Sequence, residues 1–187
     1  PPYQPQLGMA WKNLNADFDG VAMKDGLTHL ALQFWLPSDS GRIEKDTKYE
    51  IEDLSDSVIA NYVKWGNDNN VKVLLCVYNN DGKWNWNLAR NAFINHKDSF
   101  INNLILEMER LKFDGIELDL EGQGVTSKSD RAAFMIFVKE LSVILREKGK
   151  ELTIATYASE WHTPGTSMWT DLAPHVDAIT SMGYHEM

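Results

Sequence analysis

Three acidic residues alternate with apolar residues in the segment 116–121, whose sequence is Ile-Glu-Leu-Asp-Leu-Glu. Successive side chains of a β-strand point to opposite faces, so Glu117, Asp119 and Glu121 would share one face. An edge strand with one solvated face would show the same alternation. Helix-like segments on both sides favour a sheet covered by helices instead, where clustered carboxylates are costly to bury without a function. We therefore interpret the segment as a functional site.

The chemistry that these carboxylates favour is acid–base catalysis. Asp119 and Glu121 are two residues apart, which separates their Cα atoms by roughly 6.5 Å in a strand. Because two like charges this close do not both ionise easily, one proton is shared and one pKa rises. A glutamic acid that stays protonated near neutral pH can protonate a leaving oxygen. A Mg²⁺ or Ca²⁺ site is the alternative, although no second carboxylate cluster follows another predicted strand.

Six strand-like runs alternate with helical patterns along the chain. The predicted strands span residues 7–11, 28–35, 71–78, 113–120, 152–157 and 176–182. The predicted helices span residues 50–67, a segment that Asp98 would cap, a segment from Ser129 to a stop at Gly149, and, less regularly, 15–24 and 167–172. This order predicts an α/β fold with a parallel sheet, either doubly wound or closed as a barrel.

Aromatic residues stand at or just after most of the predicted strands. Functional groups in parallel α/β folds gather at the carboxyl ends of strands, and Glu121 lies at such an end. Aromatic rings around one acid predict a cleft for sugars, and no glycine-rich phosphate loop is present. Packing in the core is the alternative role for Trp84, Trp86 and Trp161. His29 lies within a strand and is expected to be a hydrogen-bonded core residue.

Composition favours one globular domain with an uncharged ligand. The 187 residues are expected to form a single domain over 1–187. The formal net charge of −9 argues against a nucleic acid or an anionic membrane as partner. The only cysteine, Cys76, excludes an internal disulfide and is expected to be a buried structural thiol. His162 and His185 have no partners at metal-ligand spacing, so no zinc site is predicted.

The acidic segment, extended to residues 114–121, resembles the Asp-Gly-x-Asp-x-Asp-x-Glu signature of family 18 glycoside hydrolases, the chitinases and their relatives. Residues 28–30 and 72–75 are similar to the family's second and third strands, and residues 181–184 resemble the Met-x-Tyr motif of its sixth. The resemblance covers nearly the whole chain in order. It implies a TIM (β/α)8 barrel, of which this chain would cover about six βα units.

The resemblance also implies a retaining glycosidase that cleaves β-1,4-linked N-acetylglucosamine polymers, chitin or chitooligosaccharides, with the substrate supplying the nucleophile. Glu121 would protonate the glycosidic oxygen and later activate water. Asp119, charge-coupled to Glu117, would bind the N-acetyl N–H, and Tyr184 would hold the acetamido oxygen. The expected substrate-binding residues are Trp35, Tyr78, Trp84, Trp86, Tyr157, Trp161, Met182 and His185.

The chain departs from the family pattern at several points. Glu117 stands where the family usually has Asp, and His185 replaces a common Asp. The third strand ends in residues 76–80, Cys-Val-Tyr-Asn-Asn, instead of Ser-x-Gly-Gly. The chain stops at Met187, straight after the sixth strand, so we expect a catalytic barrel truncated at its C-terminus.

Several functions on the same fold stay open as alternatives. They are an endo-β-N-acetylglucosaminidase, a peptidoglycan hydrolase and a non-catalytic chitin-binding lectin. Loss of the terminal Glu is the usual mark of such lectins, so the presence of Glu121 favours an enzyme. A carbohydrate polymer is the expected partner, with no cofactor and no metal. The resemblance implies a secreted or extracytoplasmic protein, although no signal peptide is present in this chain.

Overall fold

The computed structural model of the chain describes residues 7–13, 18, 26–47, 54–122, 126–160 and 162–183. Its strands are β1 (Met9–Lys12), β2 (His29–Pro37), β3 (Ile43–Lys45), β4 (Lys72–Tyr78), β5 (Gly115–Asp119), β6 (Glu151–Tyr157) and β7 (Ala178–Met182). Its helices are α2 (Asp56–Asn69), α3 (Trp86–Arg90), α4 (Lys97–Arg110), α5 (Lys128–Glu147) and α6 (Trp169–Leu172), with a π-helical turn at Asn91–Asn95 and a 3₁₀ turn at Thr166–Met168.

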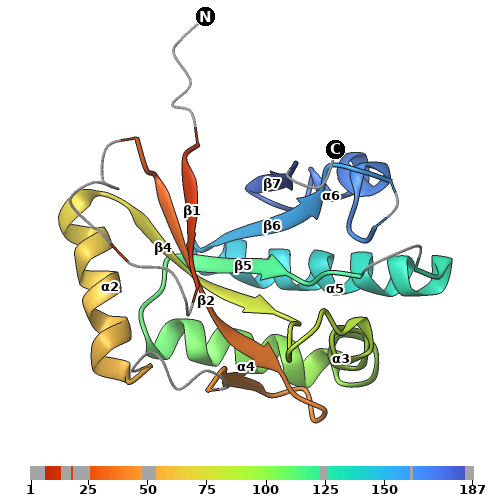
Figure 1. Cartoon of the computed structure of the whole chain (residues 1–187), viewed down its shortest axis with the longest axis horizontal. Helices are drawn as coiled ribbons and strands as arrows, with labels where there is room; N and C mark the ends of the chain where they lie inside the picture. Colours follow the sequence, from red (N-terminus) through yellow and green to blue (C-terminus); the bar gives the residue numbers. More distant parts are fainter. Residues whose placement is uncertain are drawn as a thin grey trace, which may run out of the picture.

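The strands form one curved sheet in the order β1-β2-β4-β5-β6-β7 (Figure 1). All neighbours in this order are parallel, and β3 adds an antiparallel partner to β2. The sheet curves enough that Trp11 of β1 packs against Tyr157 and Met182 near its other end. Thr180 Oγ1 likewise donates a hydrogen bond to Met9 Sδ at 3.4 Å. The six predicted strands are confirmed, and together they form a half-barrel.

The helix predictions are confirmed in part. Helix α4 begins at Lys97, so Asp98 lies in its first turn and the prediction that Asp98 caps it is wrong. Ser127, rather than Ser129, caps α5 by accepting a hydrogen bond from the Asp130 N–H at 3.0 Å. The stop at Gly149 is confirmed, because this residue has φ 65° two positions after α5 ends.

Two predicted helices include residues that lie outside the described part of the chain. The predicted helix over 15–24 lies outside the described residues apart from Phe18, and the first part of the predicted helix over 50–67 does too. The rest of that helix is α2. Strand β3, helix α3 and the π-helical turn were not predicted, because each is too short to show a hydrophobic period.

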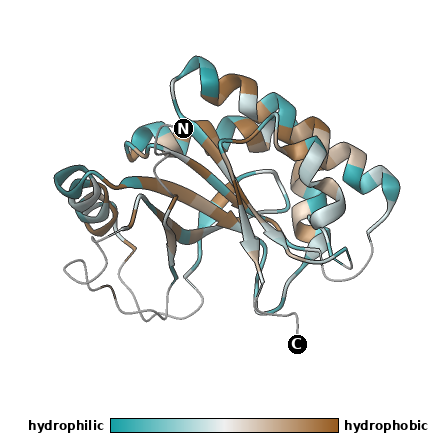
Figure 2. Ribbon diagram, turned by 90° about the horizontal axis from the view of Figure 1, so that it is seen from above, coloured by the Kyte–Doolittle hydropathy of each residue, from teal (hydrophilic) through white to brown (hydrophobic). Residues whose placement is uncertain are grey.

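Alternate side chains along each strand point either toward the helices or toward the inner face of the half-barrel. Ile116 and Leu118 of β5 face the helices and join the main core, and Figure 2 shows hydrophobic residues along the strands and on the helix faces turned toward them. The side chains of Glu117 and Asp119 point the opposite way and lie on the inner face of the half-barrel. Cys76 also lies there, fully buried beside Ala31 and Leu74, which confirms the expected buried thiol.

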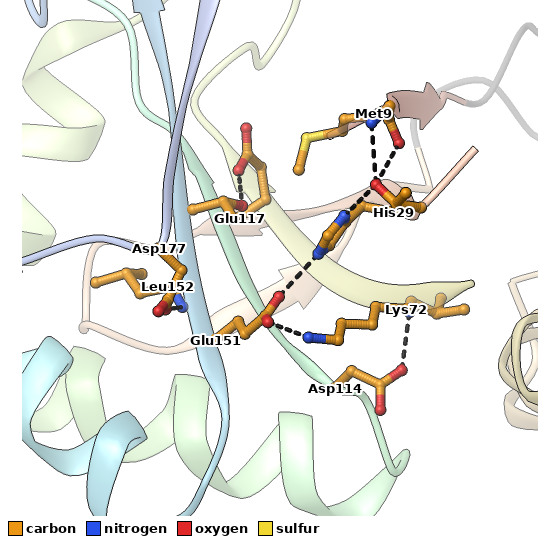
Figure 3. Close-up of polar contacts among 12 residues, drawn as sticks. Met9, His29, Lys72, Asp114, Glu117, Glu151, Leu152 and Asp177 are labelled. Carbon is orange, nitrogen blue, oxygen red and sulfur yellow. Dashed lines mark hydrogen bonds and ion pairs between the residues drawn. The ribbon is translucent and has the colours of Figure 1, made fainter. Parts of the chain in front are cut away.

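A polar network closes the end of the half-barrel where the strands begin (Figure 3). His29 Nε2 pairs with Glu151 Oε2 at 2.8 Å, and Lys72 Nζ pairs with the other oxygen of the same carboxylate. Thr28 Oγ1 lies 2.8 Å from His29 Nδ1, so both ring nitrogens are occupied. His29 is therefore the hydrogen-bonded core residue that was predicted. Such contacts at the amino-terminal end of a parallel barrel serve stability and leave the opposite end for chemistry.

None of the helices that the structure describes combines the length and the apolar character needed to cross a bilayer.

Candidate active site

Glu121 emerges from β5 with its backbone clamped by a side chain of the neighbouring strand. The fully buried Asn79 follows β4, and its Oδ1 accepts a hydrogen bond from the Glu121 N–H at 2.7 Å. Its Nδ2 donates to the Glu121 carbonyl at 2.8 Å. The β4–β5 ladder ends at the pair Tyr78 and Asp119, so the Asn79 amide continues this ladder beyond the last backbone pair. The unusual end of the third predicted strand thus fixes the position of the acid.

The residue after Glu121 is fixed as well. The Gly122 N–H donates to the Thr163 carbonyl at 2.7 Å, and the Thr163 N–H donates back to Gly122 at 3.0 Å. A Cβ on Gly122 would lie 2.8 Å from Thr126 Cγ2 and 2.9 Å from the Trp86 ring, so a larger residue does not fit without displacing them. Gly122 is therefore held by Thr163 and lies close to Trp86.

Each of the three carboxyl groups accepts a hydrogen bond from an uncharged donor on another strand of the sheet. Tyr157 donates its phenol O–H to Glu121 Oε2, and Thr153 donates its hydroxyl to Glu117 Oε2. Asp119 Oδ2 accepts a hydrogen bond from Gln33 Nε2. The three acidic residues, Glu117, Asp119 and Glu121, are only 0%, 3% and 4% exposed. The structure thus brings the three predicted acids together in a buried cluster.

Burial controls the protonation of this cluster. It raises the pKa of Glu121 from its ordinary 4.5 to about 9, the Asp119 charge adds to the rise, and the Tyr157 hydrogen bond opposes it. Burial also raises the pKa of Asp119, from 3.8 to about 6, although its interaction with Glu121 and the hydrogen bond from Gln33 oppose this. Because the charges of Asp119 and Glu121 interact, the two groups titrate as a pair, and Glu121 is the member that keeps the proton at neutral pH.

Glu117 is the deepest of the three acids. Burial raises its pKa well above the ordinary 4.5, against the opposing hydrogen bond from Thr153. Its Oε1 has no hydrogen-bond partner among the described residues, and neither does Asp119 Oδ1. An uncharged Glu117 tolerates such an environment far better than a carboxylate does. The raised pKa therefore favours the neutral form of Glu117.

Trp35 does not face the active site, which corrects its expected role in binding substrate. It is 1% exposed, packs edge-to-face on Phe113 at 5.5 Å and donates its Nε1–H to Glu107 Oε1 at 3.3 Å. The register of β2 against β4 shifts between Gln33 and Trp35, so Trp35 lies opposite Val77, a residue of the main core. This β-bulge turns the tryptophan toward the helices.

The other aromatic candidates differ in how far they are buried. Tyr78 is buried and donates its phenol O–H to Asp46 Oδ2, while the half-buried Trp84 packs edge-to-face on it at 6.5 Å. Trp86 is also half-buried, and it packs beside Phe93 at 5.4 Å with its Nε1–H donated to Asp130 at 3.2 Å. Trp84 therefore keeps a partly exposed ring near the strand ends, whereas packing explains the position of Trp86.

The remaining predicted site residues belong to the last two predicted strands. Tyr157 and Met182 are buried on the inner face, in contact with Ala155 and Trp11. Trp161, Tyr184 and His185 lie outside the described residues.

Sequence reasoning missed the hydrogen-bonding partners Gln33, Asn79 and Thr153. A signal existed for two of them, because Gln33 and Thr153 are polar residues flanked on both sides by apolar residues within predicted strands. The pairing of Asn79 with Glu121 spans 42 positions in the sequence, so only the strand register reveals it. In the part of the chain that the structure describes, no three His, Cys, Asp or Glu side chains are placed to hold a metal ion.

Solved structures share this architecture over almost the whole chain. A chitinase from Chromobacterium violaceum matches with a TM-score of 0.73 and 18% identity over 97% of this chain and 56% of its own. An Ostrinia furnacalis Group IV chitinase matches with a TM-score of 0.74 and 19% identity over 93% and 50%. The Bacillus cereus spore cortex-lytic enzyme SleL gives 0.73 and 17% over 95% and 40%. The predicted partial TIM barrel is thus confirmed, and the chain spans about half the length of these relatives.

The sequence itself gives the family. None of the curated proteins compared with the chain matches it significantly. The model of the glycosyl hydrolases family 18, however, matches residues 9–187, which includes the acidic strand and its neighbours. The chain therefore belongs to family 18 of the glycosyl hydrolases.

Proposed function

We propose that this chain carries the catalytic centre of a retaining glycosidase that cleaves β-1,4-linked N-acetylglucosamine polymers, chitin or chitooligosaccharides. The observation that carries the proposal is the buried pair of interacting carboxyl groups, Asp119 and Glu121, at the carboxyl end of β5. The raised pKa of Glu121 keeps this side chain protonated near neutral pH, so it can donate a proton to the glycosidic oxygen. Membership of family 18 supports the same conclusion.

The proposed mechanism assigns one task to each acid. Glu121 gives its proton to the glycosidic oxygen as the bond to C1 breaks. Asp119 accepts a hydrogen bond from the substrate's N-acetyl N–H, which orients the acetamido oxygen for attack on C1. The same Glu121, now a carboxylate, then takes a proton from the water that opens the intermediate. The raised pKa of Glu117 favours its neutral form, which limits the negative charge next to Asp119.

Product analysis tests this proposal. The chain is incubated with chitohexaose, and the anomer formed first is followed by proton NMR while the product lengths are determined by mass spectrometry. We expect shorter N-acetylglucosamine oligomers that are released as the β-anomer, because attack by the acetamido group retains configuration. Release of the α-anomer would contradict the substrate-assisted mechanism. Failure to cleave chitohexaose, chitin or any other N-acetylglucosamine polymer would contradict the proposed function itself.

A bacterial cell-wall polymer is the second candidate substrate, because a spore cortex-lytic enzyme shares this fold as closely as the chitinases do. Parallel incubations with peptidoglycan and with a high-mannose glycopeptide separate a peptidoglycan hydrolase and an endo-β-N-acetylglucosaminidase from a chitinase. Preferred cleavage of either substrate would replace chitin in the proposal. All of these polymers lie outside the cytoplasm, so we also propose a secreted or extracytoplasmic location.

A further inference from the structure

Tyr157, the last residue of β6, directs its phenol at the carboxyl group of the proposed acid. Its O–H donates to Glu121 Oε2, and both side chains are buried. Tyr157 is itself only 4% exposed, so little of its ring is available to stack against a sugar. The residue therefore contacts the catalytic carboxyl group more than it contacts solvent.

The segment that follows β6 fixes both partners of this hydrogen bond. The Tyr157 N–H donates to the Pro164 carbonyl at 2.9 Å, and the Tyr157 ring lies against the His162 ring with centroids 4.3 Å apart. Thr163, which lies between His162 and Pro164, pairs through both of its backbone groups with Gly122, the residue after Glu121. One short segment thus holds the tyrosine and the backbone next to the acid in a common frame.

We propose that Tyr157 is a positioning residue for Glu121, which selects the carboxyl oxygen that carries the catalytic proton and stabilises the carboxylate that remains after proton transfer. This inference rests on the proposed role of Glu121 as general acid. It replaces the sugar-binding role expected for Tyr157 with a contact to the acid.

The direction of the Tyr157 hydrogen bond determines which oxygen of Glu121 carries the proton. A phenol that donates to Oε2 makes Oε2 the acceptor oxygen of the protonated acid, so the catalytic proton resides on Oε1. In the first step the proton leaves Oε1 for the glycosidic oxygen, and the electron pair of the C1–O bond moves to that oxygen. The Tyr157 hydrogen bond then becomes charge-assisted and stronger. In the second step the carboxylate takes a proton from water, and the starting state returns.

Removal of the phenol oxygen has a signature that loss of packing does not have. The Tyr157 hydrogen bond lowers the pKa of Glu121, in opposition to burial and the Asp119 charge. Without it the acid holds its proton to higher pH, so the basic limb of the pH profile moves upward. At the same time kcat falls, by roughly tenfold or more, because the developing carboxylate loses a hydrogen bond to a charged group.

The test compares Tyr157→Phe with Tyr78→Phe in the full chain. Both substitutions remove one buried phenol O–H, but that of Tyr78 donates to Asp46 instead of Glu121. The Glu121 carboxyl is titrated by ¹³C NMR in protein labelled at glutamate, and Glu121→Gln identifies its resonance. We expect a higher Glu121 pKa in Tyr157→Phe but not in Tyr78→Phe. Tyr157→Phe should also show a lower kcat, a little-changed KM and a basic limb displaced by the same amount as the pKa.

An unchanged Glu121 pKa and an unchanged basic limb in folded Tyr157→Phe would overturn the inference, and so would a rise in KM with kcat preserved. Should Tyr157→Phe fail to fold, 3-fluorotyrosine at position 157 keeps the ring and makes the phenol a stronger donor. The Glu121 pKa must then fall, and no change would again refute the role. The NMR titration needs no substrate, so a protein that cleaves no polymer contradicts the proposed function while the positioning role is still decided.

Discussion

Asn79 is predicted to stabilise the fold and to hold the catalytic acid in place, and Asn79→Ala tests both. The substitution removes the two hydrogen bonds at 2.7 and 2.8 Å between the Asn79 amide and the backbone of Glu121. It leaves a buried N–H and a buried carbonyl of Glu121 without protein partners, and each such group costs about 1–3 kcal/mol. We therefore expect the free energy of unfolding to fall by roughly 2–6 kcal/mol.

The assay is equilibrium unfolding in urea, with kcat measured on the folded variant. A loss of this size is a large part of the ~5–15 kcal/mol that stabilises a typical domain. Asn95→Ala is the matched control, because the exposed Asn95 amide donates at 2.7 Å to the Asn91 side chain one helical turn away. This control should change the free energy of unfolding by less than about 0.5 kcal/mol.

Asn79→Asp separates the hydrogen bonds from the shape of the side chain. The aspartate keeps an acceptor for the Glu121 N–H, but it has no donor for the Glu121 carbonyl and adds a charge near the acidic cluster. We expect it to destabilise the fold as Asn79→Ala does and to raise the pKa of Glu121 further. If Asn79→Ala costs less than about 1 kcal/mol and leaves kcat unchanged, the proposed clamp on Glu121 is refuted.

Three further predictions concern the acid pair, the cleft and the closed end of the half-barrel. Asp119→Asn removes the charge that raises the pKa of Glu121, so the basic limb of the activity–pH profile should move to lower pH; an unchanged limb would show that the two groups are uncoupled. Trp84→Ala should weaken the binding of chitohexaose more than that of the dimer in calorimetry, and equal losses would favour a packing role. Hydrogen bonding to His29 first, and then the pairing with Lys72, lower the pKa of Glu151 from 4.5 to about 2. Its stabilising contribution is thus present above pH 4.5 and is lost as the pH falls toward 2, and Glu151→Gln should flatten this part of the stability–pH curve.

The strands and the acidic face were predictable because they depend on local periodicity. Alternation along β5 places Glu117 and Asp119 on one face whatever the rest of the chain does. The bulge that redirects Trp35 leaves no such pattern, because it arises from the pairing of β2 with β4. Sequence alone therefore placed a core tryptophan in the cleft.

The partners of the acids depend on register between strands that are distant in sequence. Tyr157 meets Glu121 across 36 positions, and the Gln33 amide meets Asp119 across 86. Tyr157 is recognisable as an aromatic residue at a strand end and Gln33 as a polar residue within a strand, but only the register of the strands shows which carboxyl group each one contacts. This explains why Tyr157 was expected to bind sugar, whereas the structure places it on the acid.

The most direct test of the central claim is the rate of chitohexaose hydrolysis by Glu121→Gln compared with the unaltered chain, with binding measured in parallel. The amide keeps the shape of the side chain and can still accept the Tyr157 hydrogen bond, but it has no proton to give the leaving oxygen. We predict that hydrolysis falls by roughly 100-fold or more while oligosaccharide binding stays nearly unchanged. A variant that keeps more than about a tenth of the activity would contradict the assignment of Glu121 as the general acid.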